Sequence, residues 1–455
     1  MTWKDETSGY SGEALGILKK TKVEIGDRIR VSNKGRVYEG ILIPRSEYGD
    51  EKHIVIKLKS GYNVGVRVAE DTEIEKTGAG AKPAFTTPPL PSQNTALPRA
   101  TIISTGGTIA SRVDYRTGAV RPALSATDLY SVVPELAQIA RIDTQILFSL
   151  FSENITPKHW TDLSEAVAKQ INEDVDGVVI AHGTDTMGYT AAALSFALQN
   201  IPVPVILVGS QRSADRPSSD AATNLIGAVV AATQAPFANV TLAFHETPSD
   251  TTIAFHRGTK VRKCHTSRRD TFKSVNTSPL AMLEEGKITM LTEDYRKRDK
   301  TRKLTLKPQF EEKAALLKFY PGMSPALLDW HVEKGYKGII LEGTGLGHVS
   351  KYMYEPIRKA MENNVIVAMT SQCIWGRINM NVYSAGRDLL ALGVIPLEDM
   401  LPETALVKLM WVLGQTQDPE GAKNLLRTNI AGEFSPRTLL DRLAEEDRSC
   451  ENACS

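Results

Sequence analysis

The sequence is poor in cysteine and aromatic residues and carries almost no net charge. Its 455 residues include four cysteines, and aromatic residues make up 6%. Cys264, Cys373, Cys450 and Cys454 form no CxxC pair and have no attendant histidine cluster. Neither a disulfide framework nor a zinc site is therefore expected, and a reducing, cytoplasmic setting fits this cysteine usage best.

Long hydrophobic runs are also missing. The N-terminal stretch MTWKDETSGYSGEALG is polar and mixed in charge, unlike a signal peptide, and no apolar run is long enough to span a bilayer. A net charge of +1 gives no general attraction to nucleic acid, so an RNA contact would need a local basic patch. We expect a soluble protein that is not exported and has no membrane partner.

A chain of this length is expected to form two or three domains. Changes in sequence pattern divide it into segments. Residues up to about 76 alternate apolar and polar positions like short strands. Ile54, Ile56 and Leu58 would share one face, and NKG (33–35) and SGYN (60–63) offer turns. This pattern predicts a small SH3-like β-barrel, which is typical of a docking or spacing module. The expected segments are the barrel domain (1–76), a Pro/Ala/Thr-rich linker (77–98), a first α/β domain that holds the active site (99–305), a smaller C-terminal α/β domain (306–441) and a polar tail (442–455).

Apolar strands alternate with helical segments beyond the linker. ATIIS, DGVVIAH and PVILVGS are each followed by a turn or a helical stretch, and ALLKFY, KGIILEG and VIVAMTS repeat this pattern further on. Such alternation indicates an α/β fold with parallel sheets and helices on both faces. A highly charged segment, LTEDYRKRDKTRKLTLKPQ, should form a surface connection between the two units.

Two of the predicted strands end in similar turns. TGGT (105–108) follows the first strand and HGTDT (182–186) follows the second. Ligands bind beyond the carboxyl ends of parallel strands, where free backbone N–H groups point outward. Either turn alone is better explained as a tight turn or a helix N-cap. As a pair, they place hydroxyl groups and backbone donors at one edge of one sheet.

A threonine hydroxyl needs a base to become a nucleophile. Asp185, His182 and a lysine elsewhere are candidates, and TFKSVN supplies Lys273, although composition alone does not select it. The sequence has neither the GxSxG turn of an α/β-hydrolase nor the GxxxxGK[ST] turn of a phosphate loop.

TGGTIA and HGTDTM together resemble the two signatures of the L-asparaginase family, the threonine amidohydrolases. The resemblance extends from Arg99 to about Asp441 and includes TFKSVN, EGTGLGHV and QCIWGRINMNVYSAGRDLL. It implies an L-asparaginase-like two-domain core. It also implies five catalytic residues: Thr108 as nucleophile, Thr184, Asp185 and Lys273 as the set that manages its proton, and Tyr115 as a lid residue.

The same resemblance implies a substrate site. Ser152 would bind the α-carboxylate and Asp185 the α-ammonium group, while backbone N–H groups near Thr108 and Thr184 would hold the oxyanion. Gly107 and Gly183 would let the backbone approach the amide. Glu153, where many stand-alone asparaginases have a neutral residue, either adds charge complementarity to the α-ammonium site or is an ordinary solvent-facing acid. No metal site is implied.

The barrel and linker ahead of such a core resemble the GatD family, the D subunits of archaeal glutamyl-tRNA(Gln) amidotransferases. That resemblance implies release of ammonia from glutamine or asparagine, as one half of a ligase. It implies no cofactor in this chain, with ATP and Mg²⁺ in a partner, the E subunit, which also makes most contact with Glu-tRNA(Gln). A homodimer of this chain within a heterotetramer is also implied.

Two rival functions remain open, namely a stand-alone cytosolic L-asparaginase and a non-catalytic amino-acid-binding scaffold. Two basic stretches, RKCHTSRR (262–269) and RKRDKTRK (296–303), could face RNA. Solvated loop charge explains them better because no aromatic residues are interleaved. The glycines of EGTGLGHV have the wrong spacing for a dinucleotide site, so we expect a tight turn there, with His348 in a structural role.

Overall fold

The computed structural model describes residues 9–44, 50–58, 63–79, 94, 96–107, 111–113, 120–122, 133, 135–212 and 219–438. Several sequence predictions lie wholly or partly outside these ranges: the nucleophile Thr108, the lid residue Tyr115, the SGYN turn, most of the linker and the polar tail.

The N-terminal domain is a five-stranded antiparallel sheet in the order β4-β3-β2-β1-β5. Ile54 and Ile56 are buried on one face, as predicted, and they pack with Ile29 and with helix α1 in a separate core. Lys34 and Gly35 both have positive φ in the two-residue turn between β1 and β2, which suits a tight hairpin. Its elements are α1 (Gly12–Lys20), β1 (Arg28–Asn33), β2 (Arg36–Leu42), β3 (His53–Leu58), β4 (Asn63–Arg67) and β5 (Glu73–Gly78), so β5 continues two residues into the segment predicted as linker.

The first α/β domain is built on an eight-stranded sheet in the order β18-β17-β14-β13-β12-β10-β6-β9. Strands β9, β6, β10, β12 and β13 are parallel, as predicted, whereas β14, β17 and β18 extend the sheet antiparallel. A six-residue connection joins β13 to β14 and a two-residue turn joins β17 to β18, and connections this short allow only antiparallel pairing. The bounds are β6 (Arg99–Gly106), β9 (Arg141–Leu150), β10 (Gly177–Ala181), β12 (Val205–Val208), β13 (Val240–His245), β14 (Thr252–Arg257), β17 (Ala281–Glu284) and β18 (Lys287–Met290).

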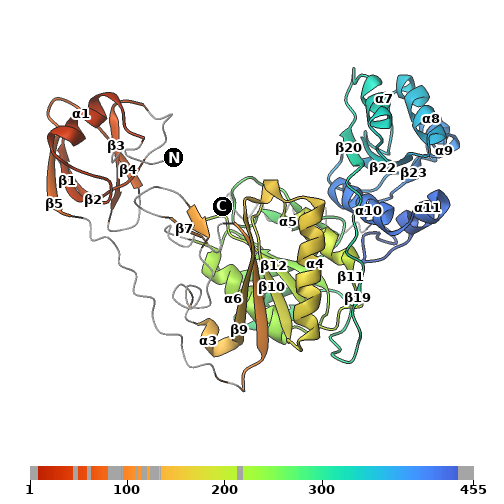
Figure 1. The fold of residues 1–455 in the computed structure, drawn as a ribbon, viewed down its shortest axis with the longest axis horizontal. Helices are drawn as coiled ribbons and strands as arrows, with labels where there is room; N and C mark the ends of the chain where they lie inside the picture. The colour runs from red at the N-terminus through yellow and green to blue at the C-terminus, as the bar shows by residue number, and fades with distance from the viewer. Residues whose placement is uncertain are drawn as a thin grey trace, which may run out of the picture.

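Helices cover both faces of this sheet (Figure 1). Helices α4 (Pro157–Asn172) and α5 (Met187–Ala197) pack on one face, and α3 (Leu136–Ile139) and α6 (Ala221–Gln234) pack on the other, each with its own core. Helix α5 buries residues all round because the second domain covers its outer side. Within the described ranges, no helix is both long and apolar enough to cross a membrane.

The second domain has a four-stranded parallel sheet in the order β20-β21-β22-β23. Trp411 of helix α10 stacks on Phe196 of α5 with ring centroids 5.9 Å apart, and this contact joins the cores of the two domains. The elements are β20 (Ala314–Lys318), α7 (Ala326–Glu333), β21 (Gly338–Gly343), α8 (Tyr354–Glu362), β22 (Ile366–Ser371), α9 (Ser384–Ala391), β23 (Ile395–Pro396), α10 (Pro402–Gln415) and α11 (Pro419–Arg427).

Shorter elements complete the described chain. They are β7 (Ser111–Val113), β8 (Val120–Pro122), η2 (Ser152–Asn154), β11 (Leu198–Gln199), β15 (Val261–Lys263), β16 (Phe272–Ser274), β19 (Thr305–Leu306) and η3 (Lys351–Met353). The EGTGLGHV segment forms the predicted tight turn, with a bridge between Thr344 and His348.

The basic run between the domains is bound to the first domain through its arginines. The Arg298 guanidinium donates to the carbonyl oxygens of Ala235 (2.9 Å), Asp176 (3.1 Å) and Ala232 (2.7 Å). Arg302 donates to the carbonyl oxygen of Ile201 in the same way. These arginines therefore satisfy main-chain acceptors, which corrects the expectation of solvated charge for them, whereas Lys297, Lys300 and Lys303 are exposed as expected.

The two basic residues at positions 297 and 298 should differ sharply in their effect on stability. Arg298→Ala leaves three carbonyl groups without their charged donor and should lower the free energy of unfolding by about 2 kcal/mol or more. Exposed Lys297→Ala should change it by less than about 0.5 kcal/mol. Denaturant unfolding of both variants checks this, and equal losses would contradict the carbonyl-binding role of Arg298.

Candidate active site

Two glycine turns touch each other at the carboxyl ends of the neighbouring strands β6 and β10. Gly106 and Gly107 both have positive φ, which non-glycine residues rarely adopt. A Cβ atom on Gly107 would lie 2.5 Å from the amide nitrogen of Gly183. The Thr105 hydroxyl donates to the carbonyl oxygen of Ala181 at 3.1 Å and fixes the two strand ends. The TGGT and HGTDT turns therefore form one site, with the first threonine of TGGT beneath it.

A buried neutral histidine shapes the second turn. His182 Nδ1 lies 2.6 Å from the carbonyl oxygen of Gly183, an acceptor, so Nδ1 carries the proton. His182 Nε2 then accepts from the Thr190 hydroxyl at 2.9 Å, and Thr190 accepts from the Trp160 indole at 3.1 Å. Burial lowers the pKa of His182 to about 4. His182 therefore orients the turn, and its low pKa and its two engaged ring nitrogens argue against it as the base.

The predicted substrate residue Ser152 is held against the same turn. The Thr186 hydroxyl donates to the carbonyl oxygen of Ser152 at 2.7 Å and makes no side-chain cap of helix α5. A Cβ atom on Gly183 would lie 2.9 Å from Ser152 Oγ. The buried Ser152 thus faces the active-site turn, whereas Glu153 beside it is exposed. The role of Glu153 stays a prediction.

The lysine at the site is Lys263. Its Nζ donates to Thr184 Oγ1 at 2.9 Å and to Asp185 Oδ1 at 2.7 Å. The prediction that Lys273 joins Thr184 and Asp185 is wrong. Lys273 Nζ donates instead to the carbonyl oxygen of Glu246 at 3.0 Å and lies 3.6 Å from Asp270.

The register of the β15–β16 hairpin explains the difference. Lys263 pairs with Phe272, and Lys273 pairs with Arg262. Opposite residues of an antiparallel pair share a face and successive residues alternate, so Lys263 and Lys273 lie on opposite faces. Phe272 is fully buried in the first domain and therefore marks the inner face. The alternation of apolar Val261 with polar Arg262 was the one sequence signal that could have favoured Lys263.

This geometry gives the site one cation between a hydroxyl and a carboxylate. The Lys263 side chain is 15% exposed, whereas the Asp185 side chain is 70% exposed and can also face a ligand. The Lys263 nitrogen and the Thr184 hydroxyl, at 2.9 Å, are within direct proton-transfer distance, and the carboxylate suits a cationic amino group. Among the described residues, no group of three His, Cys, Asp or Glu side chains could hold a metal ion.

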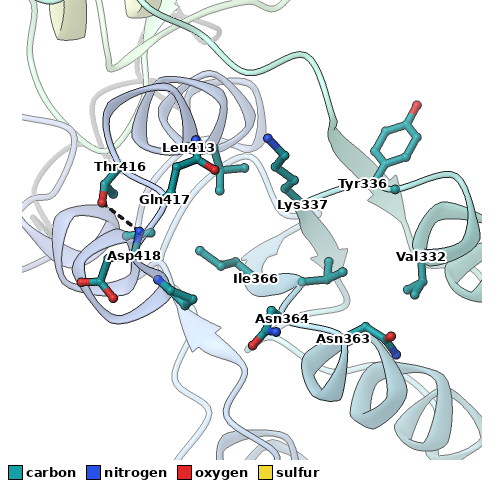
Figure 2. A pocket seen from close by; sticks show the side chains of 14 residues that line it. Val332, Tyr336, Lys337, Asn363, Asn364, Ile366, Leu413, Thr416, Gln417 and Asp418 are labelled. Carbon is teal, nitrogen blue, oxygen red and sulfur yellow. Dashed lines mark hydrogen bonds between the residues drawn. The ribbon is translucent and has the colours of Figure 1, made fainter.

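A separate hollow in the second domain lies at the amino ends of its strands (Figure 2). It is lined by Lys337, which directly precedes β21, by Ile366, the first residue of β22, and by Asp418 at the start of α11. Asp418 caps the backbone of α11, and Lys337 pairs with Glu311. Its charged groups are thus already engaged within the protein, and it is the wrong edge of a parallel sheet for a catalytic site.

Known families match the chain over three ranges. Residues 23–76 match the GatD N-terminal domain, residues 99–296 the Asparaginase, N-terminal family, and residues 313–426 the Glutaminase/Asparaginase C-terminal domain. The glutamyl-tRNA(Gln) amidotransferase D subunit of Methanothermobacter thermautotrophicus is 50% identical over 430 residues, which cover 94% of this chain and 98% of that relative. The Pyrococcus furiosus D subunit is 52% identical over 429 residues, or 92% and 97% of the two chains. The chain belongs to this GatD family.

Solved structures confirm the predicted fold of this GatD family member. The thermostable L-asparaginase from Thermococcus kodakarensis aligns with a TM-score of 0.67 and 32% identity, over 74% of this chain and 100% of its own. L-asparaginase I from Vibrio cholerae aligns with a TM-score of 0.66 and 28% identity, over 75% and 100%. The asparaginase-like two-domain core is therefore confirmed, and the N-terminal sheet agrees with the predicted small β domain.

Two buried histidines should make the fold sensitive to acid. Burial lowers the pKa of His182 from 6.5 to about 4 and that of His256 to about 3, with Lys273 adding to the effect on His256. The unfolded chain takes up these protons below pH 6.5 and the folded chain does not. Stability is therefore complete above that pH and falls between pH 6.5 and about 4, by ~1.4 kcal/mol per pH unit for each histidine.

His182→Asn keeps a donor for the carbonyl group of Gly183 and removes one of these protons. Its free energy of unfolding should vary less steeply between pH 6 and pH 4.5 than that of the unaltered protein, by ~1.4 kcal/mol per pH unit. Denaturant midpoints measured across this range check the slope, and parallel curves for the two proteins would contradict a neutral buried His182.

Proposed function

We propose that this chain is the ammonia-generating component of a tRNA-dependent amidotransferase. It hydrolyses the side-chain amide of glutamine or asparagine and passes ammonia to a partner, the E subunit, which converts Glu-tRNA(Gln) to Gln-tRNA(Gln) with ATP. The observation that carries the hydrolytic half is the contact of Lys263 with Thr184 and Asp185, at the turn that meets TGGT. The tRNA half is supported by the relatives that match nearly the whole chain.

The reaction starts at a threonine nucleophile, Thr108. Its hydroxyl oxygen bonds to the amide carbon while its proton passes to Thr184 Oγ1, and Thr184 passes its own proton to the neutral amine form of Lys263. Backbone N–H groups hold the resulting oxyanion. The C–N bond then breaks as the nitrogen gains a proton and leaves as ammonia. Water hydrolyses the acyl-threonine in a second step, which regenerates Thr108.

Substrate recognition uses the two loops that meet at Gly183. Ser152 binds the α-carboxylate and the exposed carboxylate of Asp185 binds the α-ammonium group, while Gly107 and Gly183 leave room for the backbone to approach the amide. The hydrogen bond from Thr186 to Ser152 supports this arrangement because it fixes the distance between these two loops. Glu153 adds negative charge beside the α-ammonium group.

Features outside the asparaginase-like core support a role in a larger assembly. The solved L-asparaginases cover about three quarters of this chain, whereas the GatD relatives also match the N-terminal domain, which favours a cytoplasmic amidotransferase component over a stand-alone asparaginase. ATP and Mg²⁺ bind the E subunit, and no cofactor binds here. Exposed apolar side chains on the loop between β22 and α9 support a homodimer within a heterotetramer: Ile374, Trp375, Val382 and Tyr383.

The two lysines of the β15–β16 hairpin distinguish the revised site from the predicted one. Lys263→Met removes the cation next to Thr184 and should lower kcat for glutamine hydrolysis by about 10²- to 10⁴-fold. Lys273→Met, the matched control, should stay within about threefold of the unaltered chain. Steady-state ammonia release checks both. Full activity of K263M, or the opposite order of the two variants, would reject Lys263.

Assembly with the partner separates the amidotransferase from a stand-alone asparaginase. Because ammonia is useful only when an activated acceptor waits, glutamine hydrolysis should rise at least about tenfold when the E subunit, ATP and Glu-tRNA(Gln) are added. Ammonia release measured with each component omitted in turn tests this. A full rate in the isolated chain, with no response to the partner, would support the asparaginase alternative.

A further inference from the structure

Strand β15 lies between the two domains and alternates its side chains between them. Val261 packs in the core of the first domain and Lys263 reaches the catalytic turn. Lys260, directly before the strand, and Arg262 pair instead with carboxylates of the second domain. Two contacts to the second domain therefore hold the three residues that lead to Lys263.

The deeper contact is an almost fully buried ion pair. Lys260 Nζ lies 2.7 Å from Asp399 Oδ2, and the side chains of Lys260 and Asp399 are 1% and 3% exposed. The other oxygen, Oδ1, accepts from the backbone N–H of Ser435 at 3.0 Å and lies 3.7 Å from Arg377. A carboxylate bound on both sides is a fixed anchor, and breaking one partner of a buried pair leaves an uncompensated charge.

The second contact connects β15 with helix α10. Arg262 Nε lies 3.1 Å from Glu403 Oε1, and Glu403 is in the first turn of α10. The same helix packs along α5, the helix that follows the Thr184–Thr186 turn. Burial and the nearby Glu403 carboxylate raise the pKa of Tyr189, on α5, to about 12. Helix α10 thus contacts both the strand that carries Lys263 and the helix that follows the Thr184 turn.

We infer that Asp399 and Glu403 of the second domain act as positioning residues for catalysis: through Lys260 and Arg262 they set the place of strand β15 and so keep Lys263 within reach of Thr184. This inference rests on the proposed amide hydrolysis. Catalysis needs the Lys263 ammonium in line with one hydroxyl, and a displacement of about 1 Å can cost on the order of 10²-fold in rate. Asp399 and Glu403 contribute this alignment through their ion pairs with Lys260 and Arg262.

The test uses the full chain and glutamine as substrate. Glu403→Leu, and the double variant Lys260→Met/Asp399→Asn, should lower kcat by about 10- to 100-fold. KM should stay within about threefold because the contact of Thr186 with Ser152 does not involve β15. Glu403→Gln retains an oxygen that accepts from Arg262 and should recover kcat to within about threefold of the unaltered chain.

Lys337→Met is the matched control, since it breaks an ion pair with Glu311 in the second domain that has no contact with β15 among those described. Rates are normalised to folded protein from thermal unfolding. Unchanged kcat in E403L and in the double variant, a loss equal to that of K337M, or no recovery in E403Q would overturn the inference. Full activity of K263M would instead reject the proposed function, so the two failures are distinguishable.

Discussion

The short contact between the Lys263 ammonium and the Thr184 hydroxyl is the constraint on which the site depends. Thr184 belongs to a turn between a strand and a helix, whereas Lys263 ends a short strand that pairs only with β16 among the described strands. A residue in a turn and the last residue of a short strand must therefore meet within hydrogen-bond distance. The large apolar cores on both faces of the first sheet fix the turn, and contacts with the second domain fix the strand.

Lys263 is the charged group that faces the Thr184 hydroxyl at the HGTDT turn. His182 lies immediately before the turn and could compete for this role, but burial and its contacts with Gly183 and Thr190 keep it neutral near pH 7. Asp185 is largely exposed and offers its outer side to solvent or to a cationic ligand. A hydroxyl bonded to a lysine, a neutral buried imidazole and an exposed carboxylate are thus separated within four consecutive residues and one lysine from strand β15.

Much of the fold could be predicted from the sequence because its strands are short apolar runs followed by turns and helices. The parallel part of the first sheet, the second sheet and the NKG hairpin follow from such patterns. The antiparallel edge does not, because β17 and β18 are short and half-exposed. At the site, TGGT and HGTDT indicated the correct edge, but the register of a three-residue strand decided between Lys263 and Lys273. The alternation of Val261 with Arg262 was the one local signal of that register, and it covers only three residues.

A buried ion pair such as Lys260–Asp399 would be a poor choice if stability were its only purpose, since apolar residues of equal volume often stabilise a core as well. What a buried ion pair adds is a fixed position, because moving either charge away from its partner leaves it uncompensated. The pair joins the two domains at the residue directly before strand β15, and α10 packs against the helix that follows the Thr184 turn. The proposed reaction requires that strand β15 be held in one place between the two domains. The second sheet, which carries no residue of the Thr184 site among those described, is therefore part of the catalytic framework through its connection to α10.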